Sequence, residues 1–258
     1  MLDELYPIRK QAKLQLLATA VYPMPAGGPD PTASPSTVST QDDSGPCSSP
    51  PPEQPTPQAV SKAVRFVAYG GSILEYLGGA IVNAANTGGV GGKGLDEMVN
   101  KACGGDIVAA RRALRGINEG EAKSTPSFDH KKVKHIIHAV GPTFHHPGSR
   151  TAPPKKKGEL TPEAVLAAAY TNALLKASEL KSSSVGFCLL SAGLFRGPKT
   201  TAEVIRIGLD ALKAAVAQLV ADEKVHVPKE IAIVAFSGDE QKDLAAQFCD
   251  VFVVAASK

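Results

Sequence analysis

The sequence is poor in cysteine and shows no arrangement of cysteines that marks a disulfide framework or a metal site. Four occur among 258 residues, and no two stand at the C-x-x-C spacing. They are Cys47, Cys103, Cys188 and Cys249. Small secreted folds and zinc sites ordinarily show dense or closely paired cysteines. We therefore expect reduced thiols in the core or in a linker, and no structural zinc.

Long hydrophobic runs are also absent. No uninterrupted apolar stretch reaches the roughly 18–20 residues that a membrane-spanning helix requires, so we expect no association with a membrane. The N-terminus carries Asp3 and Glu4 and lacks the basic-then-apolar layout of a secretory leader. We therefore expect an intracellular protein of the cytoplasm, the nucleus or both, while Arg9, Lys10 and Lys13 leave a mitochondrial address open.

An excess of one charge sign is missing too. The chain has 28 basic and 25 acidic residues, which gives a formal net charge of +3. Domains that bind nucleic acid usually concentrate basic residues on one face, whereas the densest basic run here is the short segment 155–157. Nucleic acid is therefore not an expected partner. We also expect the protein to be a monomer.

Composition divides the chain into three parts. Residues 1–22 place leucine and isoleucine among basic residues at near-helical spacing, which predicts an accessory helical segment. Residues 23–60 are rich in proline, serine and threonine and have almost no large apolar side chains, so they are expected to form a flexible linker. Residues 61–258 hold most of the apolar residues, and we predict that they form one domain around a single core.

Within this domain, strand-like and helix-like segments alternate. The strand candidates are 64–69, 80–82, 133–140, 185–190 and 230–236, and the helix candidates are 95–103, 107–118, 162–180, 201–220 and 243–253. Strands separated by helices of this length predict an α/β fold with helices on both faces of the sheet. Because ligands in such folds bind beyond the carboxyl ends of the strands, the loops that follow the strands are the candidate site.

One of these loops has the composition of an anion-binding loop. Residues 80–102 read AIVNAANTGGVGGKGLDEMVNKA, so Asn83 and Asn86 precede a glycine cluster that leads into a helix. Glycines let the backbone approach a ligand closely, and free N–H groups at a helix start favour phosphate. Asp96 falls in the first helical turn, where the helix dipole favours its ionised form. Residues 191–200 form a second glycine-bearing loop before a helix, and two such loops fit a diphosphate better than a single phosphate.

Two better-known nucleotide motifs do not fit this loop. Residues 89–94 match G-x-G-x-x-G, but six residues separate them from the preceding strand, and Leu114 stands where an acidic ribose ligand is expected. A P-loop requires Ser or Thr after its lysine, whereas Gly94 follows Lys93. The sequence therefore disfavours both a Rossmann domain and a nucleotide triphosphatase.

Metal-dependent and nucleophilic chemistry are also disfavoured. His135 and His138 lie in one predicted strand at an odd spacing, so they point to opposite faces and are better explained as core or edge histidines. No serine stands in a G-x-S-x-G elbow, and Ser191 has no evident histidine partner. We therefore predict no metal and no cofactor.

Four segments in order resemble macrodomains, and most of all the MacroD-type branch of mono-ADP-ribosyl hydrolases. They are AIVNAANTGGVGGKGLDEMVNKACG, VKHIIHAVGP, LLSAGLFRGPKT and IVAF, and the resemblance extends from residue 61 to the C-terminus. It implies a three-layer α/β/α sandwich with a mixed central sheet. It also implies a cleft across the strand ends that binds ADP-ribose, with ADP-ribosylated proteins as partners.

The resemblance also assigns roles to residues of this chain. Asn86 would hold a hydroxyl of the distal ribose, and Asp96 would orient or activate the attacking water. Phe195 would lie against the distal ribose, and Phe236 would stack on adenine. The remaining expected contacts to the ligand are made by Ser72, Ile73, Ala84, Gly91, Gly92, Lys93, Gly94, Leu95, Ser191, Ala192, Gly193 and Leu194.

Three places depart from the family's usual pattern. Ser72 replaces the aspartate that typically accepts from the adenine amino group, and Lys93 interrupts the glycine run. Arg196 and Gly197 replace the common glycine and tyrosine of the second loop. The implied activity is hydrolysis of esters at the distal ribose, on modified Asp and Glu side chains or in O-acetyl-ADP-ribose, by a positioned water. The alternative is a module that binds ADP-ribose or poly-ADP-ribose without turnover.

Overall fold

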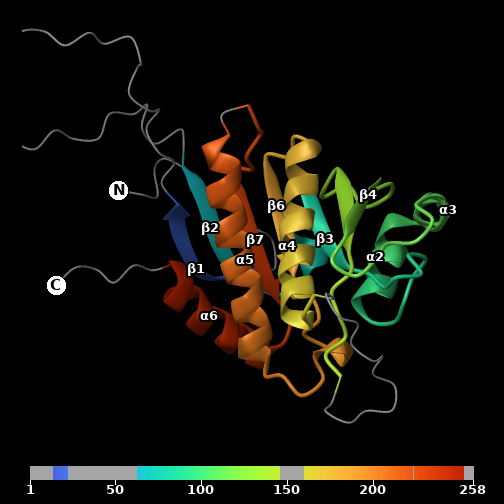
Figure 1. The fold of residues 1–258 in the computed structure, drawn as a ribbon. Coiled ribbons are helices and arrows are strands. Elements are labelled where there is room, and N and C mark those ends of the chain that lie inside the picture. The colour runs from blue at the N-terminus through green and yellow to red at the C-terminus, as the bar shows by residue number, and fades with distance from the viewer. Residues whose placement is uncertain (1–13, 23–62, 146–159, 223, 253–258) are drawn as a thin grey trace, which may run out of the picture.

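A seven-stranded sheet forms the centre of the protein, in the strand order β1-β2-β7-β6-β3-β5-β4 (Figure 1). The computed structural model describes residues 14–22, 63–145, 160–222 and 224–252. The strands are β1 (Gln15–Tyr22), β2 (Val64–Gly70), β3 (Ala80–Ala84), β4 (Ala122–Pro126), β5 (His135–Ala139), β6 (Ser184–Cys188) and β7 (Glu230–Ala235). The five strands from β2 to β5 in this order run parallel, and β1 and β4 pair antiparallel at the two edges. The predicted mixed central sheet is therefore confirmed.

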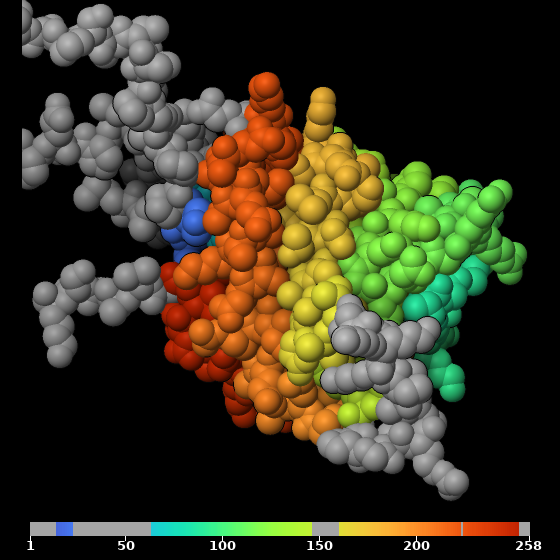
Figure 2. Space-filling model, viewed as in Figure 1, coloured from blue at the N-terminus to red at the C-terminus, as the bar shows by residue number. Residues whose placement is uncertain are grey.

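Helices flank this sheet. They are α2 (Leu95–Cys103), α3 (Asp106–Ala113), α4 (Pro162–Glu179), α5 (Thr201–Ala221) and α6 (Gly238–Phe252), together with the short 3-10 helices η1 (Ile73–Glu75) and η2 (Leu194–Arg196). In the view of Figure 1, α4 and α5 lie side by side in front of the sheet, and Figure 2 shows that they cover the middle of this face. Among the helices of the described residues, none combines the length and the hydrophobicity that crossing a bilayer requires.

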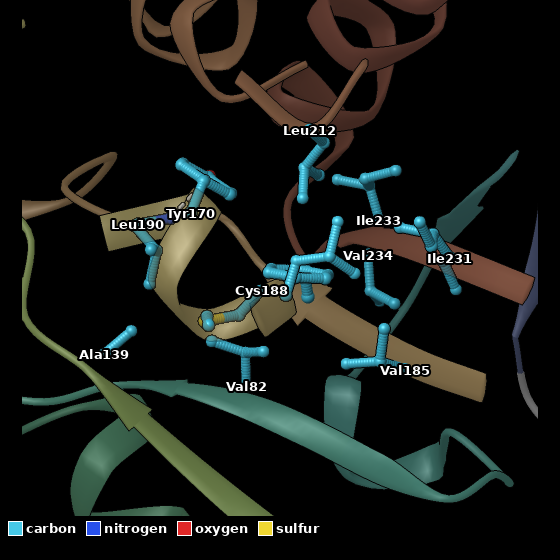
Figure 3. Packing of buried hydrophobic residues seen from close by; sticks show 14 of the residues in the cluster. Val82, Ala139, Tyr170, Val185, Cys188, Leu190, Leu212, Ile231, Ile233 and Val234 are labelled. Atoms are coloured by element: carbon cyan, nitrogen blue, oxygen red, sulfur yellow. Dashed lines mark hydrogen bonds between the residues drawn. The ribbon is translucent and has the colours of Figure 1, made fainter. Parts of the chain in front are cut away.

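The core explains why the central strands are continuous apolar runs. Nearly every residue of β2, β3, β6 and β7 is buried, as expected for parallel strands that are covered on both faces. Figure 3 shows Val82, Val185 and Ile233 of three neighbouring strands in this cluster, with Leu212 of α5 on the side of Ile233. The fold therefore has the helix-covered sheet that the sequence predicts.

Helix starts follow the local signals in the sequence. Thr161 Oγ1 accepts from the Ala164 amide at 3.2 Å, with Pro162 in the first turn of α4. Thr200 and Glu203 form a reciprocal capping box at the start of α5. Both signals were visible in the sequence because a cap depends only on residues a few positions apart.

Two strands were not predicted. The near-helical spacing within residues 1–22 suggested a helix, but residues 15–22 form β1, which pairs antiparallel with β2. The helical prediction is wrong for residues 15–22. A short apolar run fits the period of a helix or of a strand, and here pairing with the edge of β2 favours the strand. The strand β4 is polar, with the sequence AKSTP, and only its pairing with β5 identifies it. The rest of the predicted accessory segment, at 1–13, and the linker predicted at 23–60 lie outside the described residues.

Candidate ligand-binding cleft

A cleft with a volume of about 730 Å³ lies at the carboxyl ends of the parallel strands. It is lined by the segments that follow β2, β3, β5, β6 and β7, so five separate parts of the chain meet there. Every site residue predicted from the sequence lines this cleft except Gly91: these are Ser72, Ile73, Ala84, Asn86, Gly92, Lys93, Gly94, Leu95, Asp96, Ser191, Ala192, Gly193, Leu194, Phe195 and Phe236. The topology therefore brings together residues that are far apart in the sequence.

Other residues line the cleft without having been predicted. They are Gly71, Ala85, Met98, Gly141, Cys188, Leu189, Val234 and Glu240. Most of them end a strand or stand next to a predicted residue, so their positions at strand ends are the signal that could have found them. Cys188 is buried, and burial raises the pKa of its thiol to about 12. The thiol is therefore protonated at neutral pH and is not a nucleophile.

Asn86 organises the loop that follows β3. Its Oδ1 accepts from the Gly89 amide at 3.1 Å, and its Nδ2 donates to the Gly91 carbonyl at 3.0 Å. Gly91 has a φ of 129°, and a Cβ at this position would lie 2.8 Å from Asn100 Nδ2. This φ favours glycine, and the exposed Gly91 is the one predicted residue of the loop that does not line the cleft.

Asp96 lines the cleft, and hydrogen bonds from Asn83 and Arg111 hold its carboxylate. Only 4% of the residue is exposed, and it lies in the first turn of α2 as predicted. Its Oδ1 accepts from Asn83 Nδ2 and from Arg111 Nη1, both at 2.6 Å, and its Oδ2 accepts from Arg111 Nη2 at 3.1 Å. A carboxylate offers about four acceptor positions, so one lone pair remains for a further donor.

Arg111 was missed by the sequence analysis. Its side chain is completely buried, and besides Asp96 it donates from Nε to the Gly89 carbonyl at 2.5 Å and from Nη1 to Asn100 Oδ1 at 2.7 Å. One signal could have found it: Arg111 stands four residues after Ile107, on the buried face of α3. A basic residue at such a spacing is a candidate for a buried ion pair.

A second set of contacts supports Asp96 from the sheet. Asn83 of β3 lies opposite His138 of β5, and its Nδ2 is 3.2 Å from His138 Nδ1. Burial, together with the charge of Arg111, lowers the pKa of His138 to about 3, against the opposite effect of Asp96. The imidazole is therefore neutral, so Nδ1 accepts from Asn83 while Nε2 donates to Thr125 Oγ1 at 3.0 Å. Asn83 Oδ1 is buried and has no hydrogen-bond partner among the described residues.

His138 is therefore a core histidine with both ring nitrogens engaged, as the sequence suggested. Among the described residues, no group of three or more His, Cys, Asp or Glu side chains is arranged to hold a metal ion.

The second loop, which follows β6, has a constrained backbone. Ser191 adopts a φ of 55°, and its Oγ donates to the Pro142 carbonyl at 2.7 Å. Gly197 has a φ of 58°, and a Cβ there would lie 1.5 Å from the Phe144 carbonyl oxygen. The departure at Gly197 is thus explained by the backbone, because no other residue fits. Arg196 does not line the cleft, since its Nη1 donates to Thr201 Oγ1 at 2.5 Å at the start of α5.

The cleft has exposed apolar side chains along its rim. Leu194 is 94% exposed, Phe236 is 70% exposed and Phe195 is 40% exposed, and all three line the cleft. The amide of Phe236 donates to Glu240 Oε2 at 3.0 Å, which fixes the backbone where β7 leads into α6. Exposed aromatic rings on a fixed backbone suit stacking on a flat ligand.

Comparisons with known proteins agree with this geometry. The sequence profile of the Macro domain matches residues 82–206. A Macro domain-containing protein of Lactiplantibacillus plantarum is 34% identical over 171 residues, which cover 66% of this chain and 88% of that protein. The chain belongs to the macro domain family. Within that family, the ADP-ribose glycohydrolase MACROD2 of Xenopus laevis is 33% identical over 136 residues, but these cover only 29% of its length.

Solved macrodomain structures have the same fold. The Oceanobacillus iheyensis macrodomain with ADP is 26% identical, with a TM-score of 0.57, and the match covers 72% of this chain and 90% of that one. The Trypanosoma brucei macrodomain in complex with ADP-ribose is 23% identical, with a TM-score of 0.58 over 70% of this chain and 68% of that one. The predicted α/β/α architecture is therefore confirmed.

Proposed function

We propose that this macrodomain binds ADP-ribose and hydrolyses esters at its distal ribose. The substrates would be proteins carrying mono-ADP-ribose on Asp or Glu side chains, and O-acetyl-ADP-ribose. The observation that carries the proposal is the position of Asp96, a buried carboxylate with one free lone pair, on the wall of the cleft beside Asn86. The binding part is supported by two relatives: the Oceanobacillus iheyensis macrodomain, whose solved structure holds ADP, and the ADP-ribose glycohydrolase MACROD2 of Xenopus laevis.

The cleft has the features that this ligand requires. Its volume of about 730 Å³ lies within the range of small-molecule sites, roughly 300–1,000 Å³. Two glycine-containing loops offer backbone N–H groups to a diphosphate, as P-loops and other anion sites do. The Phe236 ring is available to adenine, and Phe195 and Leu194 offer apolar contact.

The chemistry asked of the residues is modest. An ester has an electrophilic carbonyl carbon and a good leaving group, so a water held at attacking distance lowers the barrier considerably. Asp96 would accept a hydrogen bond from this water, and Asn86 would hold a ribose hydroxyl. Because Asp96 is fixed by Asn83 and Arg111, it would orient the water at a constant position.

A non-catalytic reader of ADP-ribose is the second candidate. Two observations favour it: both Asp96 oxygens already accept hydrogen bonds, and Lys93 lines the same part of the wall. A cation close to the diphosphate would strengthen binding without contributing to hydrolysis.

Release of ADP-ribose from a protein modified on glutamate tests the proposal. We expect release by the wild-type protein, at least 100-fold slower release by Asp96→Ala, and unchanged release by Glu97→Ala, whose exposed side chain pairs with Lys101. Calorimetry with ADP-ribose should show binding by all three proteins. Binding without release by the wild type would establish the reader, and the absence of binding by a folded wild-type protein would rule out both functions.

A further inference from the structure

Arg111 carries a positive charge in the interior of the protein, where burying a charge is costly. It belongs to α3 and reaches the glycine loop and α2, and no part of it is exposed. Removing two opposite charges from water carries a desolvation cost that their attraction only offsets when hydrogen bonds satisfy both groups. Replacing a buried ion pair with apolar side chains of similar volume often leaves the free energy of unfolding unchanged or raises it. Stability alone therefore does not account for the pair.

The hydrogen bonds of Arg111 join three parts of the site. The two Nη atoms bind both oxygens of Asp96, and this two-point contact fixes the plane of the carboxylate as well as its position. Nε binds the Gly89 carbonyl in the loop, and Nη1 also binds Asn100 one turn after Asp96. The same guanidinium therefore sets the spacing between the glycine loop and the carboxylate.

Asp96 has little freedom left under these contacts. Asn83 of β3 also donates to Oδ1, at 2.6 Å. The Oδ2 atom lies toward the glycine loop, because a Cβ built on Gly92 would be 3.5 Å from it. Gly92 lines the cleft, and because Oδ1 accepts two hydrogen bonds and Oδ2 one, the remaining lone pair belongs to Oδ2, the oxygen nearer to Gly92.

We propose that Arg111 is a positioning residue for Asp96. It does not line the cleft; it holds the carboxylate in one orientation, at a fixed distance from the glycine loop. This inference rests on the proposed hydrolase function and names a residue on which that function depends. It predicts that loss of the two-point contact slows release of ADP-ribose through Asp96 alone.

A double-mutant cycle tests this dependence. Wild type, Arg111→Lys, Asp96→Asn and the double variant are compared in the release of ADP-ribose from a glutamate-modified protein. Lysine keeps the charge but cannot bind both carboxylate oxygens in a fixed fork, so we expect kcat to fall about 100-fold with a much smaller change in KM. In the Asp96→Asn background, Arg111→Lys should lower kcat no further, and a rise in KM shared by both backgrounds would come from the lost hydrogen bond to the Gly89 carbonyl. The exposed neighbour Arg112 provides the matched control, and Arg112→Met should behave as wild type.

Two kinetic results would overturn the proposal. One is an unchanged kcat in Arg111→Lys. The other is the same fold-decrease in both backgrounds, because independent effects multiply and a residue that acts through Asp96 cannot add to its loss.

A structural measurement separates this inference from the proposed function. If the wild type binds ADP-ribose but releases none, the hydrolase proposal fails, and the Arg111 contact is then judged by NMR of its Nη protons, which donate to both Asp96 oxygens. We expect a slowly exchanging resonance in the wild type that shifts in Asp96→Asn and stays in place in Arg112→Met. A rapidly exchanging or unshifted resonance would overturn the positioning role, and this readout also decides the case if Arg111→Lys does not fold.

Discussion

At the scale of single residues, the cleft combines fixed polar groups with exposed rings. Asp96 and Arg111 are buried and hydrogen-bonded, whereas Phe236, Leu194 and Lys93 stand at the surface. Changes in the buried residues therefore test catalysis and stability together. Changes in the exposed residues test ligand recognition with little effect on folding.

The Phe236→Ala substitution should weaken binding of ADP-ribose about tenfold. Stacking of a base on an aromatic ring contributes roughly 1–3 kcal/mol, and the exposed ring lines the cleft at the end of β7. Calorimetry gives the affinity. Leu160→Ala removes another exposed apolar side chain away from the cleft and serves as the control. Equal affinity in wild type and Phe236→Ala would show that adenine does not stack there.

The Lys93→Gln substitution should weaken binding of ADP-ribose severalfold at low ionic strength. An exposed cation close to a diphosphate gains about 1 kcal/mol in water, and salt screens this gain. The difference between wild type and Lys93→Gln should therefore shrink when calorimetry is repeated in 0.5 M NaCl. Lys101→Gln, also exposed but outside the cleft, should match the wild type. Tighter binding by Lys93→Gln would instead identify the lysine as an obstruction.

At the scale of elements, loops were easier to predict than edge strands. The two glycine loops and the capped helices were recognisable because their signals are local: glycines, caps and strand ends within a few residues. The strands β1 and β4 were not, since β1 fits two periods and β4 is polar, and both depend on pairing with a distant strand. Arg111 was missed for the same reason, because its partners Gly89 and Asp96 come from other elements.

The loop around η2 gives a stability prediction. Gly197→Ala places a Cβ 1.5 Å from the Phe144 carbonyl oxygen at a φ of 58°, so the backbone must move, and the free energy of unfolding should fall by about 1–3 kcal/mol or more. Gly105→Ala at the start of α3 meets no atom within 4 Å and has helical backbone angles, with a φ of −65° and a ψ of −32°, so it should change stability much less. Denaturant unfolding measures both. Similar losses in the two variants would show that the loop is free to rearrange.

At the scale of the whole molecule, buried histidine links stability to pH. The pKa of His138 is about 3 in the folded protein and near 6.5 in an unfolded chain. Between these values the unfolded state binds a proton that the folded state does not, so the stability falls as the pH drops from 6.5 toward 3. The lowered pKa of His130 acts in the same direction.

The His138→Gln substitution should therefore flatten this pH dependence. Glutamine can accept from Asn83 and donate to Thr125 but does not titrate, and each titrating group contributes up to about 1.4 kcal/mol per pH unit. Urea unfolding between pH 4 and 7 measures the slope, with the exposed His145→Gln as the control. Parallel curves for wild type and His138→Gln would contradict a neutral His138 in the folded state.

The cleft takes one segment from the end of each parallel strand, from Gly71 after β2 to Phe236 after β7. No continuous stretch of the chain contains the site, so a fragment that lacks any of these strands loses part of the wall. A ligand of the cleft can bind only when the whole parallel sheet is assembled, and at 100 times its dissociation constant it would add about 2.7 kcal/mol to the free energy of global unfolding. Binding of the ligand therefore reports that the domain is completely folded. Adding ligand should slow proteolysis at sites throughout most of the chain by a similar factor.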